Sequence, residues 1–70
     1  MSYEKTIPDF LRSARSECRM SQPQVAEAIG VSTATIINWE SGKAMPPFDK
    51  VNALADLYHV SLDRLAGRAS

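Results

Sequence analysis

Hydrophobic residues recur three and four positions apart along most of the chain, which is the spacing of helices with one buried face. In the first such segment, Pro8 and Asp9 favour a helix that starts at Ile7–Pro8, because proline fits the first turn and an acid suits the helix dipole there. The polar residues before it, 1–6, have no cap, so we expect a frayed tail. One face of this helix carries Leu11, Ala14, Arg15 and Cys18.

The stretch Ser21–Gly42 predicts two short helices joined by a tight turn. Ser21 and Gln24 have the spacing of a capping box, and Gly30 supplies the left-handed residue that ends the first helix. Ser32 caps the second helix, and Gly42 ends it. Two helices joined by a short turn that contains glycine form a helix-turn-helix unit, whose second helix can enter the major groove of DNA.

The second helix of this unit has two unlike faces. The side predicted to point inward carries Ile36, Trp39 and Glu40. The side predicted to point outward carries Ala34, Ile37, Asn38 and Ser41. A face that is merely solvated is normally rich in lysine and glutamate, whereas this one has no charge. We therefore expect its partner to be something other than water.

The rest of the chain predicts two more helices. After a connector at residues 43–47, a helix to about Tyr58 carries the apolar pattern Phe48, Val51, Leu54, Ala55 and Tyr58. His59 stands where a left-handed residue would end that helix. Ser61 caps a short last helix, 62–66, which Gly67 closes and whose leucines either cover the core or meet a second subunit. The prediction is all-α, a bundle of five helices, with residues 1–70 as one domain.

Arg15 and Glu40 both fall on faces that are otherwise apolar. An unpaired buried charge destabilises a protein by several kcal/mol, so the two side chains are predicted to meet in a bidentate ion pair that ties the first helix to the third. The alternative is two separately solvated charges.

The charge balance argues against strong non-specific binding to nucleic acid, because eight basic and eight acidic residues give a net charge of zero. Between Ser21 and Gly42 the only charged residues are Glu27 and Glu40, and Lys43 is the nearest cation. Contacts to phosphate from this unit must therefore come from backbone amides and neutral side chains.

Catalytic chemistry has little support in the sequence. One histidine and one cysteine, with no metal-spaced cluster and no glycine-rich phosphate loop, predict no enzyme, no cofactor, no metal and no small-molecule substrate. Cys18 is predicted to be a small buried hydrophobe, the alternative being a redox switch through an intermolecular bridge. The lone cysteine and the absence of a long apolar run or export signal favour a cytoplasmic protein without a membrane span.

The pattern of small and apolar positions in the unit resembles the Cro and phage-repressor type of helix-turn-helix. With Gln22 as the first position, the fifth is Ala26, the ninth is Gly30, and the apolar positions are Val25, Val31, Ile36 and Trp39. The likeness extends from about Leu11 to Gly67 through Arg15, the run 39–43, Pro46, and the segments 54–55 and 60–65. It implies a five-helix domain of the lambda-repressor-like DNA-binding type and the same pairing of Arg15 with Glu40.

The resemblance also implies contacts to the DNA backbone. Gln22 matches a residue that touches phosphate and edge bases, and Lys43 matches a backbone contact after the third helix. Ser32 and Thr35 would be further phosphate contacts. Ala34 departs from the family, because relatives often have a longer side chain with an amide group at this position. The short alanine side chain reduces the hydrogen bonding expected with the base pair that this position contacts.

Base reading requires side chains near the start of the second helix of the unit. Asn38 can pair bidentately with adenine, and the methyl groups of Thr33 and Ala34, with Ile37, suit the thymine methyl. We therefore expect A·T pairs in the site. Solvated surface is the alternative for Asn38 and Gln22, and incidental exposure for Ile37.

These observations predict a sequence-specific regulator that binds double-stranded DNA, most simply a repressor acting as a homodimer on a (pseudo)palindromic operator. The candidate dimer surfaces are the last helix, with Leu62, Leu65 and Ala66, and the loop of Met45, Pro46 and Pro47. The alternative is a module for protein–protein interaction, in which the uncharged face docks another protein.

Overall fold

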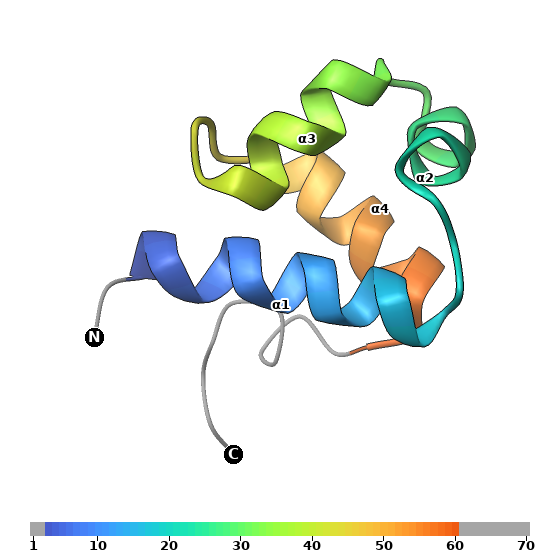
Figure 1. The fold of residues 1–70 in the computed structure, drawn as a ribbon, viewed down its shortest axis with the longest axis horizontal. Helices are drawn as coiled ribbons and strands as arrows, with labels where there is room; N and C mark the ends of the chain where they lie inside the picture. The colour runs from blue at the N-terminus through green and yellow to red at the C-terminus, as the bar shows by residue number, and fades with distance from the viewer. Residues whose placement is uncertain (1–2, 61–70) are drawn as a thin grey trace.

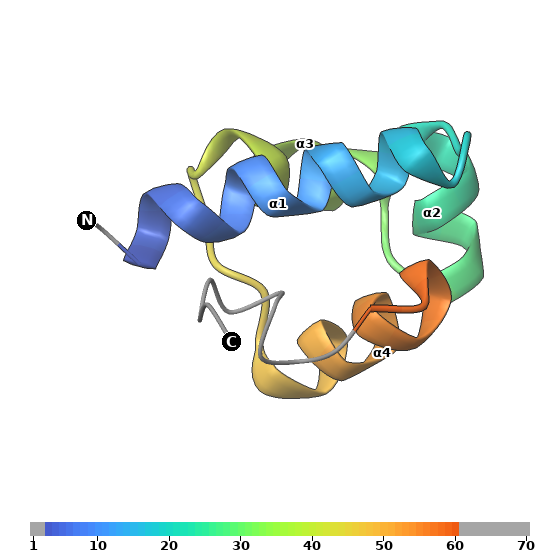
Figure 2. The ribbon, with the colours of Figure 1, turned by 90° about the horizontal axis from the view of Figure 1, so that it is seen from below.

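The computed structural model describes residues 3–60, with their side chains from residue 7 onward, and in this part it is all-helical. The elements are α1 (Tyr3–Glu17), α2 (Gln22–Ile29), α3 (Thr33–Ser41) and α4 (Phe48–Tyr58). Figure 1 shows α3 lying above α1, with α2 at one end of both. Seen from below, α1 and α4 lie on opposite sides, and α2 closes one end between them (Figure 2). The predicted fifth helix, 62–66, lies outside the described residues.

The first helix begins earlier than predicted. It starts at Tyr3, so residues 3–6 are helical instead of forming a frayed tail, and Pro8 lies inside the helix. Because proline has no N–H, it removes one hydrogen bond from the early part of the helix. The proline ring is buried, and its Cγ lies 3.6 Å from where a Cβ on Gly42 would be. Pro8 therefore lacks one helical hydrogen bond, but its ring packs against the end of α3.

The two helices of the central unit begin and end where the sequence predicted. The Ser21 hydroxyl accepts from the Gln24 amide at 3.2 Å, and the Ser21 amide donates to Gln24 Oε1 at 2.7 Å. Ser32 caps α3 by accepting from the Thr35 amide at 3.2 Å. Gly30 and Gly42 end the helices with φ of 78° and 86°. Local hydrogen bonds thus set both helices before any packing is considered.

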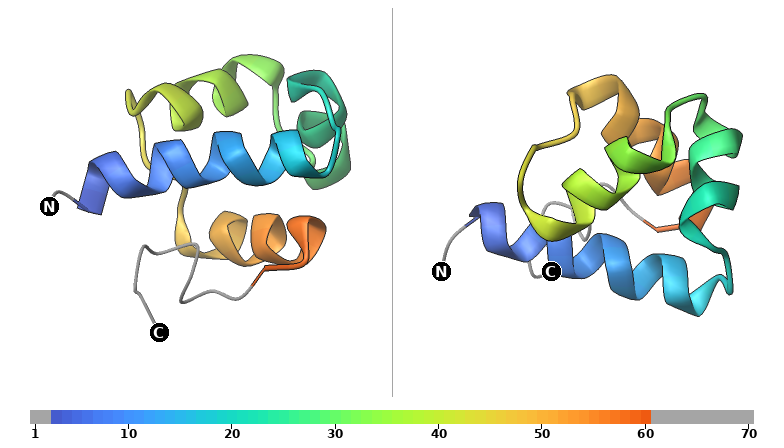
Figure 3. Two further views of the ribbon diagram at one scale, coloured as in Figure 1. Left: turned by 60° about the horizontal axis from the view of Figure 1, so that its bottom comes forward. Right: turned by 45° about the horizontal axis from the view of Figure 1, so that its top comes forward.

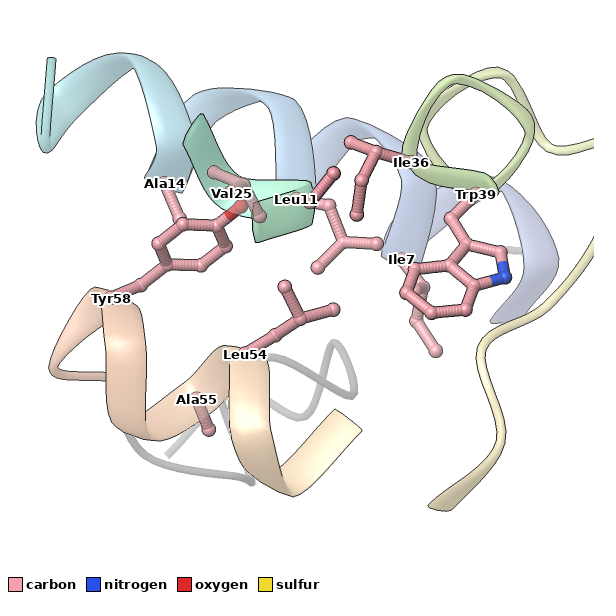
Figure 4. Packing of buried hydrophobic residues seen from close by; sticks show 10 residues of the cluster. Ile7, Leu11, Ala14, Val25, Ile36, Trp39, Leu54, Ala55 and Tyr58 are labelled. Carbon is pink, nitrogen blue, oxygen red and sulfur yellow. The ribbon is translucent and has the colours of Figure 1, made fainter. Parts of the chain in front are cut away.

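The core lies where the four helices converge. Its fully buried side chains come one from each helix: Leu11, Val25, Ile36 and Leu54. Figure 4 shows these side chains meeting, with Trp39 and Tyr58 at the two ends of the cluster. Burial, with a smaller contribution from the nearby charge of Glu40, raises the pKa of the Tyr58 hydroxyl above its ordinary value. Tyr58 therefore stays neutral inside the core.

Two apolar predictions after α3 are wrong. Phe48 was expected in the core, but 72% of its surface is exposed. Phe48 is the first residue of α4, and helical side chains lean toward the N-terminus of their own helix. The side chain of Phe48 therefore extends beyond the start of α4. Pro46, predicted as part of a dimer surface, is buried, while Met45 and Pro47 beside it are exposed.

The buried carboxylate of Glu40 holds three helices together. Only 3% of Glu40 is exposed, and Arg15 donates to it from Nε at 2.7 Å and from Nη2 at 3.0 Å. Gln22 Nε2 donates to the same carboxylate at 3.1 Å, and Arg12 Nη1 donates to the backbone carbonyl of Glu40 at 2.7 Å. We call Arg12, Arg15, Gln22 and Glu40 the Glu40 cluster. The hydrogen bonds that Arg15 donates to Glu40 raise the pKa of the Arg15 guanidinium, although burial opposes this. The cluster joins α1, α2 and α3 at one buried charge.

Removing Arg15 is expected to destabilise the fold strongly. In Arg15→Ala the Glu40 carboxylate stays buried but loses its charge partner, which should lower the free energy of unfolding by about 3–5 kcal/mol. Urea denaturation followed by circular dichroism measures this loss.

Two variants serve as controls for that measurement. Arg12→Ala removes a more exposed guanidinium and should lower the free energy of unfolding by about 1 kcal/mol. The double variant Arg15→Met/Glu40→Leu leaves no buried charge, so it should lose less than Arg15→Ala alone. An Arg15→Ala protein that unfolds at the wild-type urea concentration would show that the ion pair does not hold the helices together.

Candidate nucleic-acid interface

The outward face of α3 is held in place from behind. Ile36, Trp39 and Glu40 on the inner side are all buried, and Val25 of α2 is completely buried with them. No helix in the described part of the chain lies over the outer side of α3 in either view of Figure 3. The packing therefore presents one side of a short, capped helix to the outside.

The four predicted base-contact residues lie on or beside this outer side. Ala34 is exposed, and Ile37 is exposed over 45% of its surface. Thr33 and Asn38 are half-buried, and neither side chain has a hydrogen-bond partner within the described residues. The Asn38 backbone carbonyl, in contrast, accepts from the amides of Lys43 and Ala44 at 3.0 and 3.3 Å. The backbone at Asn38 is thus fixed, while its side-chain amide is free to bind a ligand.

The predicted phosphate-contact residues differ in how far their polar groups are already used. The hydroxyls of Ser32 and Thr35 lie 2.9 Å apart and bond to each other. Gln22 uses one hydrogen of its side-chain amide on Glu40, which leaves the second hydrogen and the carbonyl oxygen without a described partner. Lys43 is exposed just after α3. The structure therefore brings Gln22 into the Glu40 cluster, which the sequence did not predict.

The sequence also gave no role to Arg12. Arg12 and Arg15 are one turn apart on α1, and the structure directs both toward Glu40, one to its carbonyl and one to its carboxylate. Arg12 also pairs with Asp9. A cation at the end of a helix interacts favourably with the carbonyls of the last turn, so Arg12 stabilises the end of α3. The spacing of the two arginines, one helical turn apart, is the sequence feature from which the role of Arg12 could have been predicted.

No group of three histidine, cysteine, aspartate or glutamate side chains that could hold a metal occurs among the described residues. Cys18 is half-buried, and its thiol lies 3.8 Å from the Tyr58 carbonyl. None of α1–α4 has the length and apolarity needed to cross a membrane.

Comparison by sequence gives relatives among transcriptional regulators. The cryptic phage CTXphi transcriptional repressor RstR of Vibrio cholerae is 32% identical over 62 residues, which cover 89% of this chain and 55% of that protein. The chain therefore spans about half the length of this relative.

Comparison of structures agrees with the sequence. The SOS-response transcriptional repressor LexA of Eubacterium rectale matches with a TM-score of 0.86 and 30% identity, over 96% of this chain and 71% of that one. The P22 c2 repressor protein, solved in complex with a synthetic operator, matches with a TM-score of 0.79 and 25% identity, over 84% of this chain and 89% of that one.

A family model described as a helix-turn-helix domain matches residues 9–67. The matched region includes all of α2, α3 and α4 and most of α1, and thus the inner packing that presents the outer side of α3. The chain belongs to the helix-turn-helix domain family.

Proposed function

We propose that this protein is a sequence-specific transcriptional regulator of the Cro and phage-repressor type, which inserts α3 into the major groove of double-stranded DNA. The observation that carries the proposal is the rigid, uncharged outer side of α3, on which the Asn38 amide has no described protein partner. Residues 1–70 would act as one helix-turn-helix domain in the cytoplasm, most simply as a repressor that occludes a promoter.

Base reading would rest on the outer side of α3. The side-chain nitrogen of Asn38 can donate to N7 of adenine while its side-chain oxygen accepts from N6, so one bidentate pair fixes the base. Ala34 and Ile37 offer exposed apolar surface to a thymine methyl, and Thr33 offers a methyl group and a hydroxyl that has no partner among the described residues. These properties favour A·T pairs over G·C pairs at the contacted positions.

Backbone contacts would come from the edges of the unit. Gln22, Ser32, Thr35 and Lys43 are the proposed phosphate contacts. The Ser32 and Thr35 hydroxyls already bond to each other, but a hydroxyl can accept one bond and donate another, so a phosphate oxygen could be added. Gln22 would join a phosphate to the Glu40 cluster, which makes its position depend on the buried ion pair.

We also propose that the regulator binds as a homodimer, because two half-sites one helical turn apart give more affinity than one small interface. Met45 and Phe48 are exposed apolar residues at the junction of the loop and α4 and would belong to the dimer surface. The predicted contribution of Leu62, Leu65 and Ala66 lies outside the described residues.

The DNA-binding proposal is tested by selection from a pool of randomised duplexes at a stated salt concentration. Enrichment of one (pseudo)palindromic sequence is the expected result. If no duplex is enriched and the protein instead binds another protein through α3, the proposal is wrong and the module for protein–protein interaction is favoured.

Asn38→Ala should weaken binding to the selected duplex by roughly 1–3 kcal/mol, because it removes the bidentate pair. Binding to unrelated duplexes should not change. Asn52→Ala, an exposed asparagine on α4, is the matched control and should bind like wild type. Fluorescence anisotropy on both duplexes measures the difference, and equal losses on both would exclude a role in base reading.

Phe48→Lys should shift the protein from dimer to monomer, because it places a charge in the proposed apolar contact. Sedimentation velocity, with and without the selected duplex, follows the change. Ser13→Lys, at an exposed position of α1, is the control and should leave the dimer intact. A wild-type protein that is monomeric both free and on the duplex would rule the dimer out.

A further inference from the structure

Most of the cations in the described side chains already have an acidic partner. Arg12 pairs with Asp9, Arg15 with Glu40, and Lys50 lies 3.9 Å from Asp49. The two that remain are Arg19 and Lys43, and each is exposed. The fold therefore leaves two cations available for a partner outside residues 7–60.

These two cations flank the helix-turn-helix unit. Arg19 lies three residues before the start of α2, and Lys43 lies two residues after the end of α3. Figures 1 and 2 both show the loop from α3 to α4 on one side of the molecule and the connection from α1 to α2 on the other. Positive charge is thus available on each side of a neutral reading face.

The backbone at Arg19 does not require an arginine side chain. Arg19 has a left-handed φ of 58°, and its amide donates to the Ser16 carbonyl at 3.0 Å to end α1. Glycine adopts this conformation without the penalty that a side chain brings. His59 is the other non-glycine residue with positive φ among those described, and it ends α4. At Arg19 this left-handed position carries a long, exposed cationic side chain that has no partner among the described residues.

We propose that Arg19 contacts a DNA phosphate and, together with Lys43, holds the two sides of the groove against α3. This inference rests on the proposed function and adds to it. The guanidinium offers a planar fork of donors that matches two phosphate oxygens, and a charged contact supplies what the neutral α3 face lacks. Cations at the edges account for binding to a polyanion by a chain of net charge zero.

The test compares Arg19→Gly with His59→Gly on the duplex selected by the wild-type chain. Both substitutions place glycine where the backbone is left-handed, a conformation that glycine adopts without a steric penalty. Each variant should therefore melt at or above the wild-type temperature. Arg19→Gly should bind several-fold more weakly at low salt, and the slope of log Kd against log salt should fall by about one unit. His59→Gly should keep the wild-type affinity and slope, and Arg19→Lys should keep the slope.

The possible failures point to different errors. If wild type selects a duplex but Arg19→Gly keeps the full salt slope, the role of Arg19 is wrong and the DNA-binding proposal stands. If His59→Gly loses as much affinity as Arg19→Gly, the effect comes from the backbone change, and the role of Arg19 is again wrong. If wild type selects no duplex, the DNA-binding proposal and the role of Arg19 are both overturned.

Discussion

The buried carboxylate of Glu40 joins three of the four described helices at one point. A charge removed from water destabilises the fold unless hydrogen-bond donors surround it, and here the donors are Arg15 and Gln22, from two other helices. Arg12 adds a bond to the carbonyl of the same residue. Because each donor must keep its distance and direction, the cluster sets how α1 and α2 lie against the end of α3. Apolar packing alone tolerates small shifts between helices far more readily.

Fixing the inner side of α3 determines what its outer side can do. The cluster and the core take up Ile36, Trp39 and Glu40, so the side chains left outside are small, aliphatic or uncharged. Such a face can distinguish bases through hydrogen bonds and methyl contacts, but it attracts DNA only weakly. In the proposed function, reading is therefore done by α3, and attraction comes from the cations at the edges of the unit.

Left-handed residues follow all four described helices and shape the unit as much as the core does. The residues are Arg19, Gly30, Gly42 and His59. Gly30 has open space around a would-be Cβ, so it is required there for its backbone conformation and not for close packing. Gly42 combines the conformation with the neighbouring ring of Pro8. Gly30 ends α2 just before the turn, and Gly42 ends α3, the helix whose placement matters most for the proposed binding.

The helices of the central unit could be predicted from the sequence alone, because caps and glycine stops are local interactions that act within a few residues. Ser21, Gly30, Ser32 and Gly42 therefore predicted α2 and α3 correctly, and the helical spacing of Ile36 and Trp39 predicted which side is buried. Arg15 and Glu40 could be matched because each was a charge on an apolar face. The features that depend on how helices lie against one another became visible only in the folded chain. These are the burial of Pro8 inside α1, the exposure of Phe48, and the use of Arg12 and Gln22 by Glu40. A side chain with several possible partners finds its actual one only when distant segments are brought together, and helical periodicity does not contain that information.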